Sequence, residues 1–333
     1  MKIKVFNNKE DILLLKEDWE ALFDKGNYSV FQSFTYCYNS IFKQSKPFII
    51  CYYEDGKLVE IWPLELKKNK LIFINDTHAD FCDIISETNS ITVVDFLKEN
   101  QLAILLRLKN LEKESIVIRK TESIKAKDVS FSLNYSLLKL RKSDNFPSNF
   151  NHFVYRQKRR LKRILKKYNY NTVLYEIESS TFPIEKIKKL RIQMIEIGIR
   201  NHKFLDDDLI SLTENLYTSG SLVINEVVVE NNTTAISLIF KKDYSYSFWI
   251  DLFNEQQMMN LVSNTAFIKE ITQKNSATFN FGRGDYSYKI QNFGPEVIPL
   301  FELNTYSTEV EKYLSLFLKS VKLVLKKLYK KFR

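Results

Sequence analysis

The chain has 333 residues, more than one hydrophobic core usually supports, so two domains are expected. Its three cysteines are isolated and odd in number, which argues against a disulfide framework and a zinc site and favours a reducing, cytoplasmic location. The net charge of +10 is concentrated in segments 156–167 and 308–333, each of which could meet a polyanion, and no run of about 18 apolar residues predicts a membrane span.

The first elements are predicted by the spacing of apolar residues. Apolar residues at helical spacing predict an amphipathic helix at 9–23, and runs rich in strand-forming residues predict strands at 48–53 and 57–66. Asp55-Gly56 between the two strands is a strong hairpin signal. Because proline cannot donate to a ladder, Pro63 predicts that the second strand is an edge strand or contains a bulge.

A polar segment at 75–83 follows a short strand predicted at 71–74. It contains the carboxylates Asp76, Asp80 and Asp83 and the imidazole of His78. Burial and mutual repulsion can raise the pKa of a carboxylate toward neutrality, so these groups could form a general-base cluster. The alternative is a solvated loop without a catalytic role.

The first half ends in a segment that resembles a linker. A helix near 91–99 and short elements at 103–108, 115–119 and 134–140 complete an alternating α/β half. Residues 143–149, Ser-Asp-Asn-Phe-Pro-Ser-Asn, are rich in turn formers. We therefore predict a first domain over residues 1–145 and a second domain that begins at residue 150.

The second half begins with a strongly basic helix. Eight of the twelve residues from Arg156 to Lys167 are Arg or Lys, and none is acidic. Such a run ordinarily forms a solvated face, but like charges at this density repel one another. A phosphate-bearing partner is therefore favoured for this helix.

The elements that follow suggest an internal duplication. A strand at 173–177 precedes a helix at 183–200 that has Pro183 in its first turn, and a further helix begins at Asp206 or Asp207 as N-cap. Three strands are then predicted, at 222–229, 235–240 and 244–250. Segments 48–68 and 222–242 both consist of a strand, a tight turn, a strand and Lys-Lys, which indicates two copies of one α/β unit.

The end of the second half carries the strongest signal for a site. A polar loop at 251–257 leads into a helix at 258–274, and a strand at 278–281 opens into Gly282-Arg283-Gly284-Asp285. Glycine occurs only seven times in the chain, so two glycines here mark a sharp turn or a close approach to the backbone. The N–H groups and dipole at the N-terminus of the helix favour an anion in the preceding loop. The alternative is a polar loop that only caps a strand.

Residues 281–289, Phe-Gly-Arg-Gly-Asp-Tyr-Ser-Tyr-Lys, resemble the Phe-x-Arg-Gly-Asp-x-x-Tyr-Lys signature of the CelD-like and FemAB-like branch of the GNAT acyltransferase superfamily. Weaker matches are Phe31-Gln32-Ser33, Asp80-Phe81-Cys82-Asp83, the basic helix and residues 198–204, and the resemblance covers residues 19–302. It implies an α/β (α+β-type GNAT) fold of two tandem GNAT-like domains with mixed sheets, at 1–145 and 150–305. A C-terminal basic amphipathic helix at 306–333 follows them.

The resemblance also implies an activity. Members of this branch are acyltransferases, so an acyl-CoA-dependent N-acyltransferase, specifically an N-acetyltransferase, is expected. Its acceptor would be an amine, such as an amino sugar or another lipid or polysaccharide precursor of the cell envelope. Such an enzyme holds the amine and the thioester in near-attack geometry, removes a proton from the amine and stabilises an oxyanion. It needs acetyl-CoA or another acyl-CoA as co-substrate, and no metal.

Site residues are carried over from the matching positions. The resemblance implies Asp285 as base or amine orienter and Tyr288 as proton donor to the leaving thiolate. The implied sites are, for catalysis, Asp285, Tyr288, Asp80, Asp83 and His202; for the acyl-CoA, Met259, Asn260, Leu261, Trp249 and Ile250; and for the substrate, Arg283, Lys289, Arg200, Gln32 and Arg159. A lone histidine such as His202 is more often structural than catalytic.

One departure from the family pattern concerns the donor. The family loop before the helix that contacts acyl-CoA ends in Pro-Gly and two apolar residues, whereas this chain has Met259-Asn260-Leu261-Val262. Asn is the best substitute for glycine where φ is positive, so the turn is expected to persist at Asn260. One alternative keeps the fold and replaces acyl-CoA with aminoacyl-tRNA, to which the basic helix would supply phosphate contacts. Another is a non-catalytic nucleic-acid-binding or membrane-binding protein.

Residues 308–333 are predicted to form one basic amphipathic helix. Its apolar residues recur at a spacing of three or four, and lysines occupy most of the remaining positions. Packing against the body of the protein and peripheral contact with the inner face of an anionic plasma membrane are equally favoured. The membrane alternative would agree with a lipid-linked acceptor.

Overall fold

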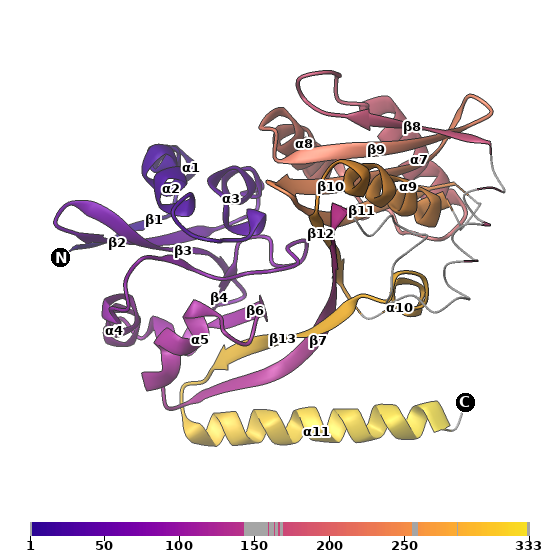
Figure 1. The fold of residues 1–333 in the computed structure, drawn as a ribbon. Coiled ribbons are helices and arrows are strands. Elements are labelled where there is room, and N and C mark those ends of the chain that lie inside the picture. Colours follow the sequence, from indigo (N-terminus) through magenta and orange to yellow (C-terminus); the bar gives the residue numbers. More distant parts are fainter. Residues whose placement is uncertain are drawn as a thin grey trace. The chain divides into compact units, whose positions relative to one another are not determined.

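The computed structural model describes residues 2–142, 159, 163, 166, 169–254, 259–284 and 286–331 (Figure 1). Contacts divide the chain into two compact units. Unit 1 contains residues 1–132 and 299–333, and unit 2 contains residues 133–298. The linker-like segment 143–149 and most of the basic helix lie outside the described residues, although Arg159, Arg163 and Lys166 are helical and exposed.

Unit 1 contains a five-stranded antiparallel sheet in the order β1-β2-β3-β4, with β5 also paired to β3. Its strands are β1 (Lys2–Phe6), β2 (Pro47–Glu54), β3 (Lys57–Lys67), β4 (Lys70–Phe73) and β5 (Ile85–Ser86). The predicted hairpin is confirmed, because β2 and β3 pair directly across a turn in which Asp55 has φ 49° and Gly56 has φ 81°. Positive φ at both turn residues is the geometry that favours Asp-Gly.

Of the two outcomes predicted for the strand of Pro63, the edge position is wrong, whereas β3 does contain a bulge, at Val59 rather than at Pro63. β3 lies inside the sheet, and Pro63 pairs with Ile49 of β2. The carbonyl of Pro63 accepts from the N–H of Ile74, so the polar main-chain side of Pro63 faces away from β2. On that side the partner of β3 changes from β5, which pairs at Ile61, to β4, which pairs from Leu64. The missing N–H falls between the two partner strands, where a ladder does not need it.

Short helices cover the sheet of unit 1. The helix predicted at 9–23 is present as two helices, interrupted at Leu14 and Leu15. The helices and 3₁₀ turns are α1 (Lys9–Leu13), α2 (Lys16–Phe23), η1 (Val30–Gln32), α3 (Phe34–Asn39), α4 (Thr92–Glu99), η2 (Leu102–Leu105), α5 (Ile116–Lys120) and η3 (Thr121–Ser123). Trp19 of α2 and Trp62 of β3 are fully buried and anchor the core of this unit.

A strand from the end of the chain completes unit 1. β6 (Arg107–Leu111) pairs with the C-terminal part of β13 (Glu296–Thr305), for example at Leu303 and Leu108. A parallel bridge joins Leu71, in β4, to Leu106, just before β6. The tail then forms α11 (Glu309–Lys331), which confirms the helix predicted there.

Unit 2 contains six strands in the order β7-β12-β11-β10-β9-β8. The strands are β7 (Lys127–Leu140), β8 (Tyr170–Tyr175), β9 (Leu222–Val229), β10 (Asn232–Lys242), β11 (Ser245–Phe253) and β12 (Ala277–Arg283), and the helices are α7 (Ile184–Glu196), α8 (Asp207–Thr218), α9 (Met259–Lys274) and α10 (Ser287–Phe293). β11 and β12 pair in parallel, and the other ladders are antiparallel. Asp206 caps α8 as predicted, because its side chain accepts from the N–H of Leu209.

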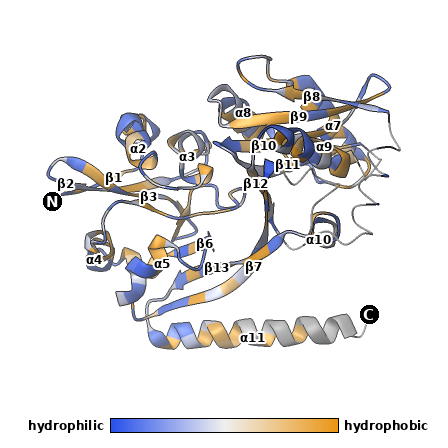
Figure 2. Cartoon of the chain, in the orientation of Figure 1, coloured by the Kyte–Doolittle hydropathy of each residue, from blue (hydrophilic) through white to orange (hydrophobic). Residues whose placement is uncertain are grey.

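Helices cover both faces of the sheet in unit 2. Adjacent residues of a strand point to opposite faces, and in β9 the side chain of Asn225 bonds to Ser263 of α9 while that of Glu226 bonds to Lys186 of α7. α9 and α7 therefore lie on opposite faces. Figure 2 shows that hydrophobic residues dominate β9, as expected for a strand that is buried on both faces.

The two units repeat one strand order. In each, four antiparallel strands are followed by a parallel contact, β4 with β6 in unit 1 and β11 with β12 in unit 2. The final strand of each unit comes from the other half of the sequence, because β13 pairs with β6 and β7 pairs with β12. The domain boundaries predicted near residues 145 and 305 stay predictions. The two compact units are divided within β7, after residue 132, and within β13, after residue 298.

Candidate functional site

The two parallel strands of unit 2 pair along only part of their length. Ser245–Ser247 of β11 pair with Thr278–Asn280 of β12, and the ladder ends there. Beyond that point β11 continues its pairing with β10, while Arg283 of β12 pairs with Tyr135 of β7. The strands thus separate toward their C-terminal ends, which in parallel sheets are the usual place for a ligand.

Aromatic rings pack where the strands separate. Phe248 of β11 and Phe281 of β12 are the first residues after the last pair, and their rings stack with centroids 5.3 Å apart. Phe281 also stacks on Phe293 of α10, at 4.6 Å. These rings belong to the buried cluster under α9, so an apolar layer holds the strands in their separated positions.

A β-bulge in β11 changes which side chains face α9. Leu238 of β10 pairs with Ile250 and Ile239 pairs with Phe248, so Trp249 is the extra residue. Phe248 belongs to the cluster under α9, and by strict alternation Asp251 would point to the opposite face. The extra residue reverses the alternation, and Asp251 reaches Asn264 on α9. The predicted cofactor-binding residues Trp249 and Ile250 are therefore the bulge itself, and this assignment stays a prediction.

Asp251 belongs to a polar cluster within the apolar layer of unit 2. We call it the Asp251 cluster, and it consists of Asn225, Ser237, Asp251, Ser263 and Asn264. The Ser237 hydroxyl donates to Asp251 Oδ1 at 2.8 Å, and Asn264 Nδ2 donates to Oδ2 at 3.4 Å. Asn225 Nδ2 donates to the hydroxyl and carbonyl of Ser263, at 2.9 and 3.1 Å. These four partners are almost fully buried, whereas Asp251 is partly exposed.

Burial raises the pKa of the Asp251 carboxyl above its ordinary value. The hydrogen bonds from Ser237 and Asn264 and the positive charges of Lys289 and Arg200 act in the opposite direction, but burial outweighs them. A carboxylate whose pKa is raised binds a proton more readily than an ordinary carboxylate does, which is the property of a general base. Asp251 is therefore the described residue of unit 2 best suited to act as a general base. The sequence predictions missed it, because they assigned Asp251 to a loop.

Lys289 holds the glycine-rich turn after β12. Its buried ammonium donates to the carbonyl of Arg283 at 2.9 Å and to those of Gly282 and Gly284 at 3.4 Å each. Gly282 and Gly284 have φ of 70° and 90°, and a Cβ at Gly284 would lie 2.6 Å from the ring of Tyr286. The two glycines are thus required by the backbone. The substrate-binding roles predicted for Lys289 and Arg283 stay predictions.

Two predicted catalytic groups fall outside the described part of the chain. Asp285 is not among the described residues, and for Tyr288 the structure describes the backbone, in α10, but not the side chain. Both assignments stay predictions.

The loop between α7 and α8 carries Arg200 and His202. Arg191 of α7 holds it, because its guanidinium donates to the carbonyls of Phe204 and His202, at 2.8 and 2.9 Å. The guanidinium of Arg200 lies 4.8 Å from the ring centre of Phe204. His202 is exposed. The structure thus supports Arg200 as a positive charge near Asp251 and gives His202 no described contact with the Asp251 cluster.

The predicted acyl-CoA residues at the start of α9 are placed as follows. Met259 and Leu261 are buried, and Asn260 is partly exposed. Asn260 is the second residue of α9, so its backbone is helical, and the positive φ expected there is wrong. Its side-chain oxygen accepts from the N–H of Leu261 at 2.8 Å, which occupies one of the donors that an anion would use. Residues 255–258, just before the helix, lie outside the described residues.

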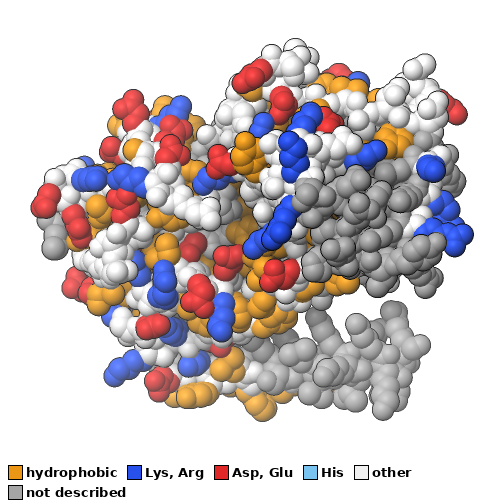
Figure 3. Space-filling view, viewed as in Figure 1, with side chains coloured by type: hydrophobic (Ala, Val, Ile, Leu, Met, Phe, Trp, Pro, Cys, Tyr) orange, Lys and Arg blue, Asp and Glu red, His pale blue; other side chains and the backbone are white. Residues whose placement is uncertain are grey.

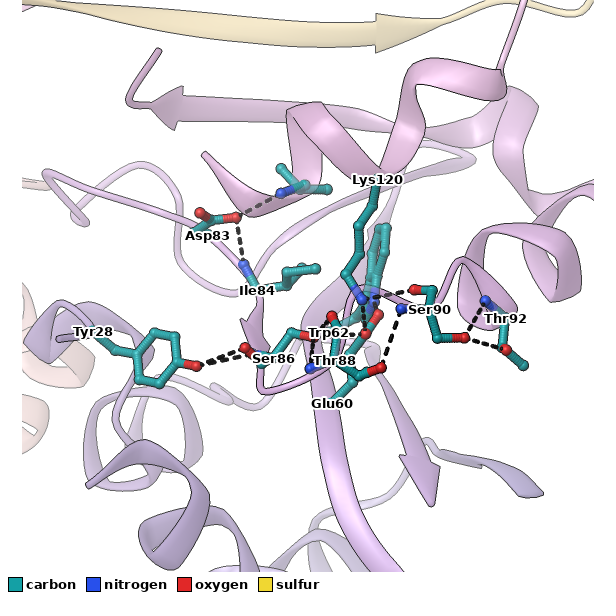
Figure 4. Close-up of polar contacts among 11 residues, drawn as sticks. Tyr28, Glu60, Trp62, Asp83, Ile84, Ser86, Thr88, Ser90, Thr92 and Lys120 are labelled. Atoms are coloured by element: carbon teal, nitrogen blue, oxygen red, sulfur yellow. Dashed lines mark hydrogen bonds and ion pairs between the residues drawn. The ribbon is translucent and has the colours of Figure 1, made fainter. Parts of the chain in front are cut away.

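The predicted site residues of unit 1 have structural partners. The amide of Gln32 accepts from the N–H of Ser29 and donates to the carbonyl of Ile84. Asp83 accepts from the N–H groups of Ile84, Ile116 and Val117, so it caps α5, and burial raises its pKa to about 6 (Figure 4). These contacts indicate structural roles.

The polar segment at 75–83 is not a solvated loop. Asp76 and Asp80 are buried, and Asn110 Nδ2 donates to the carbonyls of Asp76 and Ala79, at 2.9 Å each. The Nδ1 atom of His78 lies 2.8 Å from Asn75 Oδ1. A catalytic role for Asp80 or Asp83 stays a prediction.

Unit 1 contains its own buried charged cluster, which the sequence predictions also missed. Glu60 of β3 accepts from Lys120 of α5, from Trp62 Nε1 at 2.6 Å and from the Ser86 hydroxyl at 2.8 Å (Figure 4). Lys120 also donates to the carbonyl of Ser90 at 2.8 Å. Both charged side chains are almost completely buried, so this cluster is closed to a ligand.

The described residues contain neither a cluster of metal ligands nor a membrane-spanning helix. No group of three or more His, Cys, Asp or Glu among them could hold a metal ion. Within the same residues, no helix combines the length and the apolar composition needed to cross a bilayer.

Comparisons with known proteins identify the fold. No protein-family model matches the chain, and no curated protein matches it in sequence. Among solved structures, the C-terminal domain of a putative lysylphosphatidylglycerol synthetase from Agrobacterium fabrum aligns with TM-score 0.63 at 10% identity, covering 94% of this chain and 96% of that one. FemX aligns with TM-score 0.62 at 9% identity, covering 94% and 99%.

A tandem GNAT protein from the clavulanic acid biosynthesis pathway aligns with TM-score 0.51 at 7% identity, covering 92% of this chain and 99% of that chain. The fold class is therefore confirmed: the chain is a mixed α/β protein with the fold of tandem GNAT proteins. At these identities the likeness concerns the fold alone, and function must be argued from the site.

Proposed function

We propose that this chain is an acyltransferase that transfers an acyl group from a thioester to an amine, with its reaction centre in unit 2. The observation that carries this proposal is Asp251, a partly exposed carboxylate with a raised pKa at the C-terminal end of a strand that has separated from its parallel neighbour. The GNAT-like fold supports the same class of reaction, because the proteins that share it include a tandem GNAT protein and FemX.

In the proposed reaction, the amine nitrogen forms a bond to the thioester carbonyl carbon and loses a proton to the Asp251 carboxylate. The tetrahedral intermediate then collapses, and the bond from carbon to sulfur breaks. The departing thiolate takes up a proton, for which Tyr288 is the candidate donor. Asp251 then returns its proton to solvent, and the Tyr288 phenolate takes up a proton from solvent. Ser237 and Asn264 fix the orientation of the carboxylate, since each donates one hydrogen bond to it.

For the donor we propose acetyl-CoA or another acyl-CoA, which makes the enzyme an N-acyltransferase of the GNAT type. The separated strands and the adjacent start of α9 support this choice, because helix N-termini favour phosphate groups. The acceptor we propose is an amino sugar or another amine precursor of envelope lipid or polysaccharide. This acceptor, and membership of the CelD-like and FemAB-like branch, rest on the sequence resemblance at residues 281–289.

Calorimetric titration of the purified protein with acetyl-CoA tests the donor. Saturable micromolar binding is expected, and Asn260→Gly should strengthen it, because removing the amide frees the N–H of Leu261. Asn275→Gly, at an exposed position after the same helix, is the matched control. If neither the parent protein nor Asn260→Gly binds acetyl-CoA, the acyl-CoA donor is excluded.

A second donor, aminoacyl-tRNA, is favoured by one specific observation. The TM-score to the domain named for lysylphosphatidylglycerol synthesis is 0.63, against 0.51 to the tandem GNAT protein. The exposed cations Arg159, Arg163 and Lys166 would then contact phosphates. This alternative predicts binding of charged tRNA that weakens steeply with salt, together with transfer of a labelled amino acid that requires Asp251. Binding without any transfer would favour a non-catalytic protein.

A further inference from the structure

The C-terminal helix α11 exposes its apolar side. Seven of its large apolar side chains are exposed, with Phe317 at 64% and Leu314 at 58%. The others are Val310, Tyr313, Leu318, Val321 and Leu325. With 100° per residue, these seven positions fall on one side of the helix, which we call the apolar face of α11. Figure 3 shows hydrophobic side chains at the surface where the described part of α11 begins.

The opposite side of α11 is the one turned toward the rest of unit 1. Lys312, Ser315 and Leu316 are partly buried, and they lie across the helix from the apolar face. Burial lowers the pKa of Lys127 in β7, and the charge of Lys312 adds to this effect. Hydrogen bonds from Ser307 lower the pKa of Glu311, and the charge of Lys70 in β4 adds to this effect. The first turns of α11 therefore lie within electrostatic range of both strands. An amphipathic helix that only packed on its own domain would bury its apolar face instead. Figure 2 shows the alternation of hydrophobic and hydrophilic residues along the described part of the helix.

The charge of residues 312–333 indicates which kind of partner α11 would bind. From Lys312 to Arg333 the sequence contains eight cations and no acidic residue. A second copy of this helix would bring like charges together, and a nucleic acid would leave the exposed apolar face without a partner. An anionic bilayer fits both the apolar face and the positive charge of α11, because its acyl chains accommodate the apolar face and its lipid phosphates attract the lysines.

We propose that α11 is a membrane-surface helix that lies in the interface of an anionic bilayer with its apolar face inserted. Its 23 residues extend roughly 34 Å, long enough to lie flat on the surface over several lipid headgroups. This inference rests on unit 1 and holds whether or not unit 2 transfers an acyl group. If it does, the helix brings the enzyme to lipid-linked acceptors.

Sedimentation of the full-length protein with lipid vesicles tests the proposal. One set of vesicles contains phosphatidylcholine alone, and the other contains phosphatidylcholine and phosphatidylglycerol in equal amounts. The protein is expected to sediment with the anionic vesicles at low salt and to be released as salt is raised, because screening weakens the attraction. Phosphatidylcholine alone should bind it much more weakly.

Three variants separate the apolar contribution to vesicle binding from the electrostatic one. Phe317→Gln should weaken binding to anionic vesicles about tenfold, since one large side chain no longer leaves water. Lys326→Gln with Lys330→Gln should weaken it by about 25-fold, since each charge near the surface contributes about fivefold. Leu14→Gln is the matched control, because Leu14 is 81% exposed in unit 1 but lies outside α11, and this variant should bind as the parent does.

Several outcomes would overturn the proposal. One is failure of the parent protein to bind anionic vesicles, and another is binding that Phe317→Gln and Leu14→Gln affect equally. If vesicles are not bound but the parent is a dimer that Phe317→Gln converts to a monomer, the apolar face is a self-association surface. If duplex DNA is bound with a dependence on the lysines but not on Phe317, the partner is a nucleic acid. Circular dichroism of each variant confirms that the helix and the fold are retained.

Discussion

Units 1 and 2 share a strand order, yet each places a carboxylate in its sheet in a different way. In unit 1, Glu60 of β3 is bonded to Lys120, Trp62 and Ser86, and the pair is closed off from solvent. In unit 2, Asp251 of β11 receives two side-chain hydrogen bonds and remains partly exposed.

The difference follows from what each carboxylate has beside it. A bonded ammonium compensates the buried charge of Glu60, and this makes the cluster a structural one. The cations near Asp251, Lys289 and Arg200, act on it through their charge, while the ammonium of Lys289 is bonded to the carbonyls of the glycine turn. Burial raises the pKa of Asp251, and these cations compensate for only part of that effect, which leaves a raised pKa of the kind that a general base requires.

Removing the carboxylate of Asp251 should give the largest effect on activity. Asp251→Asn keeps the size of the side chain and can keep the hydrogen bond from Ser237, but it loses the acceptor oxygen for Asn264 and cannot accept the proton of the amine. The rate of acyl transfer should fall by about 10²–10⁴-fold with the melting temperature nearly unchanged. Asp243→Asn, in the exposed turn before β11, should leave the rate unaltered. If Asp285→Asn abolishes transfer while Asp251→Asn does not, the base is Asp285.

Breaking the pair in unit 1 should instead affect stability. Lys120→Met leaves the charge of Glu60 buried without its partner, which should lower the free energy of unfolding by about 3–5 kcal/mol. Adding Glu60→Gln to Lys120→Met should restore a large part of this loss, because the unpaired charge is gone. Denaturant titration measures both variants. A loss below about 1 kcal/mol for Lys120→Met would mean that the pair is far more solvated than its burial indicates.

The pH dependence of stability should carry the signature of Asp83. Its pKa is about 6 in the folded protein and lower in the unfolded chain, so the folded state binds more protons between about pH 4 and pH 6. The stability that Asp83 contributes is therefore present at low pH and is lost as pH rises through 6. Asp83→Asn should remove this fall, and denaturant titrations of both proteins from pH 4 to pH 7 measure it. Parallel curves for the two proteins would contradict the raised pKa.

The smallest effect is expected from Arg200. Its positive charge lowers the pKa of Asp251, so Arg200→Ala should raise that pKa further. The acidic limb of the pH profile of kcat/KM should move to higher pH by up to about one unit. Lys203→Ala, exposed in the same loop, is the control and should leave the limb in place. A shift to lower pH would mean that another group sets the limb.

Much of the fold could be predicted from the sequence. Alternation and turn chemistry were sufficient for the hairpin at Asp55-Gly56 and for the three strands from β9 to β11, because these signals are local. Pro63 misled the prediction, because the effect of a missing N–H depends on which strand lies beside it. A change of partner strand is a tertiary property that one segment does not encode.

The site was less predictable. Asp251 appeared to belong to a loop, since a bulge at Trp249 changes its face and no local sequence signal marks a bulge. Likewise, Asp83 lies in a polar segment that has the residue types of a catalytic cluster. In the structure it caps a helix that lies about thirty residues further along the chain. Gly282 and Gly284 were correctly marked as backbone-determined, because positive φ is the property for which glycine is selected.

Because β13 pairs with β6 of the first unit and β7 pairs with β12 of the second, the pairing affects how the protein can fold during its synthesis. A domain usually folds once its own residues have emerged, the N-terminal one first. Here the edge of β6 that pairs with β13 has no partner until residues 301–304 have been synthesised, so the N-terminal unit remains incomplete until then. During that interval β6 exposes an unpaired edge, the kind of surface that chaperones shield and that promotes aggregation. A fragment that ends near residue 145 should therefore be poorly soluble, although the sequence marks that position as a domain boundary.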